Sequence, residues 1–234
     1  MNRRDALQPL IKGGIYCITA ASLSGGRDNI AVVRCMLRAG VKVIQYREKK
    51  KAMRVQYREC LKIRELTRAY KAVFIVNDHA DLCRLVKADG VHLGQEDLPV
   101  PAARVIIGPG RLIGVSTHSP AQFRKAMADG ADYAGVGPIF ETHTKEDVVP
   151  PVGLAYLDWA RRNASIPYVA IGGIHEGNID VVAHRTACIA VVSDIVAAAD
   201  IVGKIKRLQA KLNPAARPAQ CRFSRQSDAT HCNA

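Results

Sequence analysis

The feature that most constrains the fold of this chain is a regular alternation of two kinds of segment. Short apolar runs rich in β-branched residues are separated by longer runs with helical periodicity, as expected for βα units around a parallel sheet. Eight strands are predicted, at residues 15–19, 42–46, 73–76, 90–93, 112–115, 133–136, 168–171 and 188–192. Helical patterns between and after them cover residues 29–39, 53–70, 80–87, 120–129, 153–162 and 194–212.

Eight units in a chain of this length predict a single (β/α)₈ barrel, or TIM barrel. The chain has 234 residues, and such a barrel needs roughly 200 to 250. Hydrophobic residues make up 48% of the chain but aromatic residues only 5%. This balance suits parallel strands of Val, Ile, Leu and Ala that are buried on both faces. Residues 1–213 are therefore predicted to form one barrel domain.

The last part of the chain has a different composition. Residues 214–234 lose hydrophobic periodicity and are rich in Pro, Ala, Arg and small polar residues. A segment without apolar periodicity cannot bury enough surface to order itself. We expect a disordered basic tail outside the barrel.

The net charge of +13 raises the alternative of a nucleic-acid-binding protein, because Lys and Arg supply most of the affinity for a phosphate backbone. Thirteen Lys or Arg stand against three Glu within residues 34–71, but no aromatic residues are regularly interleaved with them. We interpret most of this excess as a solvated helix face, with a few positions facing a phosphorylated small molecule. No nucleic-acid partner is expected.

The cysteines and the N-terminal residues indicate the cellular compartment in which the protein is expected. Seven cysteines are scattered without a C-x-x-C pair or a zinc-like Cys/His spacing, which favours reduced thiols. The N-terminal residues lack the apolar run of a secretory signal, and no stretch reaches the roughly 18 apolar residues of a membrane span. A cytoplasmic protein without a membrane partner is expected.

Polar residues gather after the predicted strands, where barrels of this class carry their active sites. Gln45, Arg47 and Lys49 alternate after the second strand, so an extended backbone would place all three on one side. Such a triplet can bind an anion, although a solvated strand end is the simpler alternative.

Two carboxylates after neighbouring strands form a candidate Mg²⁺ site. Asn77 and Asp78 follow the third strand, and Asp97 follows the fourth. Magnesium takes one or two carboxylates, several waters and phosphate oxygens of a substrate. Asp78 could instead cap the next helix, and Asp97 could serve only in a turn. His92 lies inside an apolar strand and is predicted to be packed and hydrogen-bonded rather than a general base.

Further polar and glycine positions follow the later strands. Ser116 ends the fifth strand and could simply begin a turn. Thr142, Thr144 and Lys145 form a loop after the sixth strand that suits a phosphate or carboxylate. A glycine pair after the seventh strand, which includes Gly173, and the dipeptide Val192-Ser193 after the eighth occupy the usual phosphate-binding positions of this fold.

Taken together and in this order, these segments resemble the thiamine phosphate synthase family over roughly residues 14 to 200. The matching segments are QYREK at 45–49, NDHADL at 77–82, ADGVHLGQEDLP at 88–99, GVSTH at 114–118, GVGPIFETHTK at 135–145 and AIGGI at 170–174. Two positions depart from the family: Ala20 stands where an acidic residue is frequent, and His143 where Pro is common.

The resemblance implies a role for each candidate residue. One group would bind hydroxymethylpyrimidine diphosphate: Gln45, Arg47, Lys49, Asn77, Ser116 and Lys145. Asp78 and Asp97 would hold Mg²⁺ on the diphosphate, and Lys145 would help to neutralise the leaving group. A second group would bind hydroxyethylthiazole phosphate: Thr142, Thr144, Gly173, Val192 and Ser193. Arg47, Lys49, Ser116 and Lys145 would be the catalytic residues.

The implied reaction is loss of pyrophosphate from the pyrimidine methylene group and capture of the resulting carbocation by the thiazole nitrogen. It requires stabilisation of a departing anion and no strong base. An alternative is a thiazole tautomerase-like relative that binds thiazole phosphate without synthase activity. Retention of Arg47, Lys49, Asp78, Asp97 and Lys145 favours the synthase, and the sequence leaves a homo-oligomer open.

Overall fold

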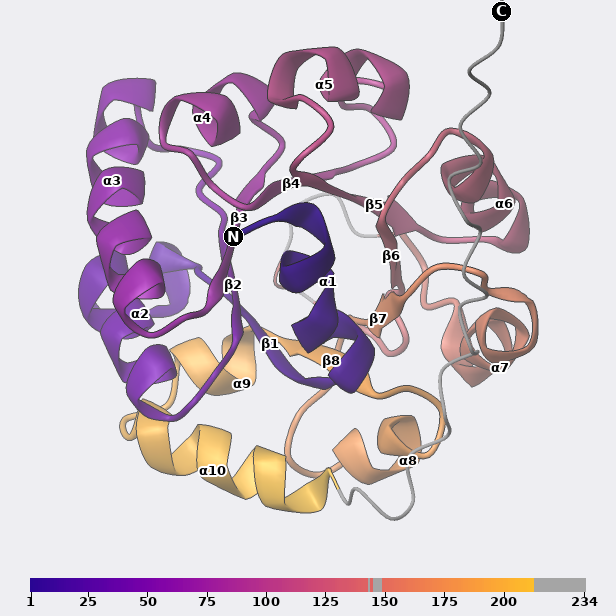
Figure 1. The fold of residues 1–234 in the computed structure, drawn as a ribbon. Coiled ribbons are helices and arrows are strands. Elements are labelled where there is room, and N and C mark those ends of the chain that lie inside the picture. Colours follow the sequence, from indigo (N-terminus) through magenta and orange to yellow (C-terminus); the bar gives the residue numbers. More distant parts are fainter. Residues whose placement is uncertain (143, 145–148, 213–234) are drawn as a thin grey trace, which may run out of the picture.

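The computed structural model of the chain, which describes residues 1–142, 144 and 149–212, is a closed barrel of eight parallel strands (Figure 1). Each strand pairs with its sequence neighbours, and β1 pairs with β8 to close the ring. This confirms the predicted (β/α)₈ fold. The strands are β1 Gly14–Ile18, β2 Val43–Tyr46, β3 Val73–Asn77, β4 Gly90–Leu93, β5 Leu112–Thr117, β6 Tyr133–Val136, β7 Tyr168–Ala170 and β8 Cys188–Val191.

Most of the helices form a ring around this sheet, whereas α1 lies over the centre of the barrel (Figure 1). The helices are α1 Arg3–Lys12, η1 Ala21–Leu23 (a 3₁₀ turn), α2 Asn29–Arg38, α3 Met53–Ala69, α4 Ala80–Leu85, α5 Val100–Ile107, α6 Pro120–Ala128, α7 Gly153–Asn163, α8 Ile179–Ala183, α9 Ser193–Val196 and α10 Ile201–Lys211. The predicted strands match to within one or two residues. Helices α1, α5 and α8 lie outside the predicted helical ranges.

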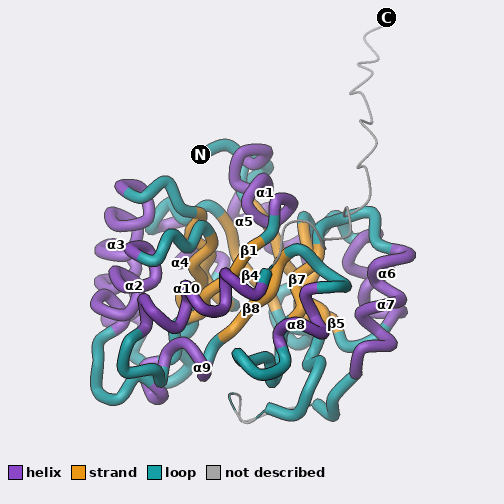
Figure 2. The backbone as a smooth tube through the Cα atoms, turned by 90° about the horizontal axis from the view of Figure 1, so that it is seen from below, coloured by secondary structure: helices purple, strands orange, loops and turns teal. Residues whose placement is uncertain are grey.

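Two apolar layers stabilise the barrel. The larger one fills the space between the strands and the outer helices, and the smaller one lies inside the ring of strands. Helix α1 covers one opening of the barrel, at the end opposite to α9 (Figures 1 and 2). Ala6 and Leu10 of this helix belong to the inner layer and are fully buried, and Arg3 forms an ion pair with Asp132. Ligand access is therefore expected at the other opening.

The prediction of one helix over residues 194–212 is wrong, because the chain breaks between α9 and α10. The guanidinium of Arg27 donates to the carbonyl oxygens of Val196 and Ala198, both at 2.8 Å. These carbonyls at the end of α9 thus find a partner outside the helix. Asp200 then caps the new helix α10 by accepting from the Gly203 N–H at 2.9 Å.

The basic segment 34–71 divides between different environments. Arg54, Arg58, Lys62 and Arg68 are exposed on the outer face of α3. Arg64 is instead buried in a bidentate ion pair with Asp89, with N–O distances of 2.7 and 3.0 Å. The predicted solvated helix face therefore accounts for much of this segment's charge, and one of its cations is structural.

Three further predictions concern the ends and the thiols of the chain. The predicted tail at residues 214–234 lies outside the described residues. Of the seven cysteines, the five that the structure describes are free thiols. Among the helices described, none combines the length and apolar character needed to cross a membrane.

Candidate active site

A cavity opens at the carboxyl-terminal ends of the strands, opposite to α1. Its volume is about 130 Å³, roughly ten times the 10–15 Å³ that a single water needs. A small organic molecule can therefore enter it. Nine of the predicted site residues line its wall: Gln45, Arg47, Asn77, Ser116, Thr142, Thr144, Gly173, Val192 and Ser193.

The other predicted residues have different positions. Lys49 forms an ion pair with Asp78 with an N–O distance of 2.9 Å, and Asp97 contacts the same aspartate. Lys145 lies outside the described residues. We call Arg47, Lys49, Asp78 and Asp97 the charged side of the site. The residues from the ends of β6, β7 and β8, namely Thr142, Thr144, Gly172, Gly173 and Val192, form the glycine side.

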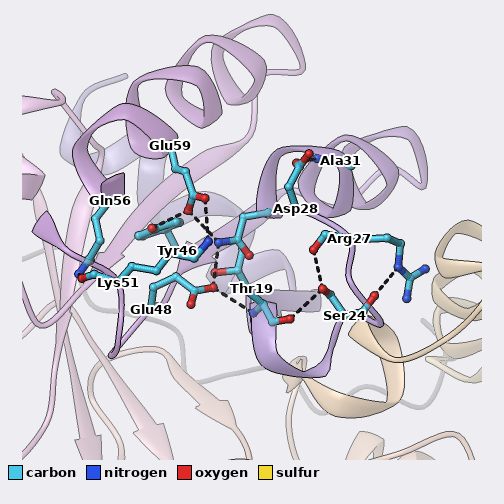
Figure 3. A network of polar contacts seen from close by, with 12 residues as sticks. Thr19, Ser24, Arg27, Asp28, Ala31, Tyr46, Glu48, Lys51, Gln56 and Glu59 are labelled. Carbon is cyan, nitrogen blue, oxygen red and sulfur yellow. Dashed lines mark hydrogen bonds and ion pairs between the residues drawn. The ribbon is translucent and has the colours of Figure 1, made fainter. Parts of the chain in front are cut away.

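Hydrogen bonds from the preceding βα unit hold the segment after β2, which carries Arg47 and Lys49 (Figure 3). The Arg47 N–H donates to the hydroxyl of Thr19 at 2.8 Å. The carboxylate of Glu48 accepts from the Ala21 N–H at 3.0 Å and from the Asn29 amide at 2.8 Å. These contacts place the backbone of this segment before any ligand arrives.

Glu59 of α3 is the centre of a second set of contacts on the same segment (Figure 3). Its carboxylate accepts from Tyr46 and Lys51, both at 2.7 Å, and from Asn29 at 2.9 Å. Burial by itself would raise the pKa of Glu59, but hydrogen bonds from Lys51, Asn29 and Tyr46 lower that pKa below its usual value. The carboxylate is therefore ionised at neutral pH and joins both ends of the segment to α3.

Asp78 and Asp97 form an acidic pair beside the cavity. Burial raises the pKa of Asp97 above its usual value, and the neighbouring Asp78 raises it further. Lys49 opposes this shift by placing a positive charge near both carboxylates. Within the described residues, no group of three or more His, Cys, Asp or Glu side chains gathers as a metal cluster. The arrangement is thus a pair of carboxylates with one ammonium group beside them.

The alternatives for the two aspartates are also settled. Asp78 does not cap α4, because His79 occupies the N-cap position and makes no side-chain cap bond. Asp78 has a positive φ of 60°, which is uncommon for a residue other than glycine. Asp97 does serve in a turn, since its carboxylate accepts from the Gly94 N–H at 2.6 Å. The turn holds Asp97 while it contacts Asp78.

A chain of hydrogen bonds crosses the floor of the cavity. The Gln45 amide nitrogen lies 2.8 Å from the Tyr16 hydroxyl, which lies 3.0 Å from the Tyr133 hydroxyl. His92 Nδ1 is 3.1 Å from Tyr133, and His92 Nε2 is 2.9 Å from the Ser116 hydroxyl. The prediction of a packed, hydrogen-bonded His92 is confirmed, and its ring also lines the cavity.

The glycine side depends on close approach between two backbones. The loop after β6 continues along the end of β7, with the Ile139 N–H donating to the Ile171 carbonyl at 2.9 Å and the Phe140 N–H to the Gly172 carbonyl at 3.0 Å. A Cβ at Gly173 would lie 2.3 Å from the Glu141 carbonyl oxygen, and Gly173 has a φ of +63°. Only glycine fits such a position without strain.

This pairing delivers the hydroxyls of Thr142 and Thr144 to the cavity wall, 3.1 Å apart. Val192 and Ser193 approach from the end of β8. The carbonyls at the end of α9 are held by Arg27, as described above. Among the described residues, the glycine side therefore presents hydroxyl groups and backbone rather than charged side chains.

The sequence predictions missed three residues that organise the site: Tyr16, Tyr133 and Glu59. Tyr16 and Ile18 are two positions apart in β1 and therefore share one face of the strand. The inward direction of Tyr16 could have been inferred from this period of two. Glu59 lay within a basic helical pattern and carried no local signal. Its partner Asn29 comes from the preceding βα unit, and its partners Tyr46 and Lys51 lie 13 and 8 residues away in its own unit.

Comparison with known proteins agrees with this geometry. Residues 15–195 match the family model described as thiamine monophosphate synthase. A thiamine-phosphate synthase from Pelotomaculum thermopropionicum is 57% identical over 90% of this chain and 97% of that protein. One from Caldicellulosiruptor saccharolyticus is 50% identical over 89% of this chain and 95% of that protein.

A solved structure shares the same architecture. The thiamine phosphate pyrophosphorylase from Pyrococcus furiosus superposes with a TM-score of 0.80 at 35% identity, over 87% of this chain and 96% of that chain. The family match, the relatives' identity over most of their length and the closed barrel agree with one another. This chain therefore belongs to the thiamine monophosphate synthase family.

Proposed function

We propose that this chain is a thiamine-phosphate synthase, a transferase that joins hydroxymethylpyrimidine diphosphate to hydroxyethylthiazole phosphate and releases pyrophosphate. The observation that carries the proposal is a cavity whose wall contains Arg47 and the glycine side, with the ion-paired Lys49 and Asp78 beside it. A reaction that expels a diphosphate and retains a phosphate monoester needs two anion sites of different strength. The names of the relatives support the same activity.

The pyrimidine diphosphate would bind on the charged side and the floor. Arg47 and Lys49 offer cations to the diphosphate, and both belong to a segment held by Glu48 and Glu59. Gln45, Asn77 and Ser116 line the adjoining wall and supply uncharged hydrogen-bonding groups to the pyrimidine. Guanidinium and ammonium groups suit this role because their bonds to phosphate oxygens are charge-assisted.

Asp78 and Asp97 would hold Mg²⁺ against the diphosphate. The donor set fits, because two carboxylates leave room for waters and phosphate oxygens, as this ion prefers. Burial raises the pKa of Asp97, and the neighbouring Asp78 raises it further, so a bound cation would favour the ionised form of this carboxylate. When bound, the ion would supply positive charge to the departing pyrophosphate.

The thiazole phosphate would bind on the glycine side. Thr142 and Thr144 place hydroxyls on the wall, and Gly173 and the Val192-Ser193 backbone leave space for close approach. Loops after the seventh and eighth strands are the usual phosphate site of this fold. In this position the thiazole nitrogen would face the pyrimidine methylene group.

The chemistry follows from these two sites. The C–O bond of the pyrimidine methylene group breaks, and its electron pair leaves with pyrophosphate. The aminopyrimidine ring stabilises the cation that remains, and the thiazole nitrogen donates its lone pair to form the C–N bond. Arg47 and Lys49 would stabilise the charge that develops on the leaving group, and we propose the same role for Lys145.

A thiazole tautomerase-like protein is the second candidate, since it would need only the glycine side. The charged side argues against it, because Asp78 there contacts both Lys49 and Asp97. Purified protein incubated with both phosphorylated precursors and Mg²⁺ should form thiamine phosphate and pyrophosphate in equal amounts. Binding of thiazole phosphate without product would favour the second candidate.

A further inference from the structure

The barrel interior contains a continuous chain of hydrogen-bonded polar groups that joins two residues of the cavity wall. Tyr16, Tyr133 and His92, which we call the relay, connect Gln45 on β2 to Ser116 on β5. Tyr133 is 0% exposed and Tyr16 is 2% exposed. Burying a polar group costs free energy unless that group is hydrogen-bonded. These hydrogen bonds are therefore a fixed part of the site.

The Gln45 amide nitrogen donates to the Tyr16 hydroxyl. Either hydroxyl could donate in the Tyr16–Tyr133 contact, but the buried proton of Tyr16 needs an acceptor, and the Tyr133 oxygen offers one at 3.0 Å. We therefore assign Tyr16 as the donor to Tyr133. Tyr133 then donates to His92 Nδ1, which must accept and be unprotonated. The remaining ring proton of a neutral His92 lies on Nε2 and is donated to the Ser116 oxygen.

We propose that Tyr16 and Tyr133 are positioning residues that hold His92 in the Nε2-protonated tautomer, so that the Ser116 hydroxyl directs its own hydrogen into the cavity. The tautomer rests on this assignment of donors, whereas its effect on turnover rests on the proposed function. The relay therefore makes Ser116 a hydrogen-bond donor toward a ligand, where the opposite direction would make it an acceptor.

Space inside the barrel is reserved for the relay. A Cβ at Gly114 would lie 2.1 Å from Cζ and 2.5 Å from the hydroxyl of Tyr133, so this ring occupies the volume of a missing side chain. A Cβ at Gly135 would lie 3.6 Å from His92 Nε2. Burial raises the pKa of both tyrosines, so each is a neutral phenol that can donate and accept at once.

The tautomer can be observed directly. The protein is labelled with ¹⁵N-histidine for NMR, and the His92 signals are assigned by their loss in His92→Gln. We expect Nε2 to be protonated and Nδ1 to be unprotonated. Tyr133→Phe removes the donor to Nδ1 and should let the Nδ1-protonated tautomer appear. A proton on Nδ1 in the unmodified protein, or an unchanged tautomer in Tyr133→Phe, would overturn the proposal.

Steady-state kinetics test the link to Ser116. Tyr133→Phe should lower kcat/KM for the pyrimidine diphosphate roughly tenfold, as expected for one misdirected hydrogen bond, and leave KM for thiazole phosphate unchanged. In a Ser116→Ala background, Tyr133→Phe should have little further effect, because both changes remove the same contact. Additive losses would contradict a relay acting through Ser116.

Two further variants keep the test decisive. Tyr168→Phe also removes a tyrosine hydrogen bond, to the Arg185 carbonyl at 2.9 Å, but the hydroxyl lies away from the cavity, so kinetics and tautomer should not change. If Tyr133→Phe does not fold, Tyr16→Phe breaks the relay one step earlier and should give the same tautomer shift. Unmodified protein that shows the expected tautomer but forms no thiamine phosphate would refute the proposed function and leave the relay intact.

Discussion

The charged side and the glycine side of the cavity are built by different means. The charged side consists of side chains, and the segment that carries Arg47 and Lys49 is held by a network of ionised and hydrogen-bonded groups around Glu59. The glycine side is formed by backbone that approaches backbone, with Gly173 under the Glu141 carbonyl. The first can be tuned through charge, whereas the second tolerates almost no added atom.

This difference predicts that removal of metal affects one side only. With excess chelator, turnover should fall by a factor on the order of a hundred or more, because the departing pyrophosphate loses its main source of positive charge. Thiazole phosphate binding, measured by calorimetry, should stay within error. Asp97→Asn should reproduce the loss, and Asp81→Asn on the exposed face of α4 is the matched control. Full turnover in chelator would remove Mg²⁺ from the proposal.

Gly173→Ala should damage the other side. The left-handed conformation costs a side chain about 1–2 kcal/mol, and the added Cβ would lie 2.3 Å from the Glu141 oxygen. The loop should shift, and KM for thiazole phosphate should rise on the order of tenfold while KM for the pyrimidine diphosphate changes little. Gly110→Ala is the control, since a Cβ there meets nothing within 4 Å. Equal changes in both KM values would contradict separate binding of the two substrates on the two sides.

Glu59→Gln should have a smaller effect, confined to the charged side. It weakens bonds to an ionised carboxylate, so we expect a loss of roughly 2 kcal/mol in unfolding free energy and a several-fold rise in KM for the pyrimidine diphosphate. Glu65→Gln, exposed on the same helix, should behave like the unmodified protein.

The same variant has a pH signature. The pKa of Glu59 is lowered by folding, so its stabilising contribution is present above the unfolded pKa and is lost as the pH falls through the folded pKa. The stability difference between the unmodified protein and Glu59→Gln should therefore be largest near neutral pH and shrink in acid. A difference that is independent of pH would mean that the charge of Glu59 does not stabilise the fold.

Deletion of residues 214–234 should have the smallest effect, with activity and melting temperature nearly unchanged. The segment has no apolar periodicity that could dock on the barrel. The alternative is that Phe223 and the neighbouring arginines cover one end of the barrel. A marked loss in either measurement would place the domain boundary after residue 213.

Much of the fold and of the site could be predicted from local pattern. Alternation of apolar and helical segments predicted all eight strands, because the hydrophobic pattern of a strand or helix can be recognised within about ten residues. The period of two placed Gln45 and Arg47 on one side, and both line the cavity. Asp78 and Asp97 were expected to meet because the ends of neighbouring parallel strands lie together.

Contacts between distant parts of the chain decided the rest. At the break between α9 and α10, Asp200 is a local signal for the start of α10, but the partner of the Val196 carbonyl is Arg27, 169 residues away. The Tyr16–Tyr133 hydrogen bond joins residues 117 positions apart and exists only because β1 and β6 face each other across a closed barrel. Periodicity thus determined the strands and their inward faces, but which inward side chains touch depends on the closure and register of the ring, and those are properties of the tertiary structure.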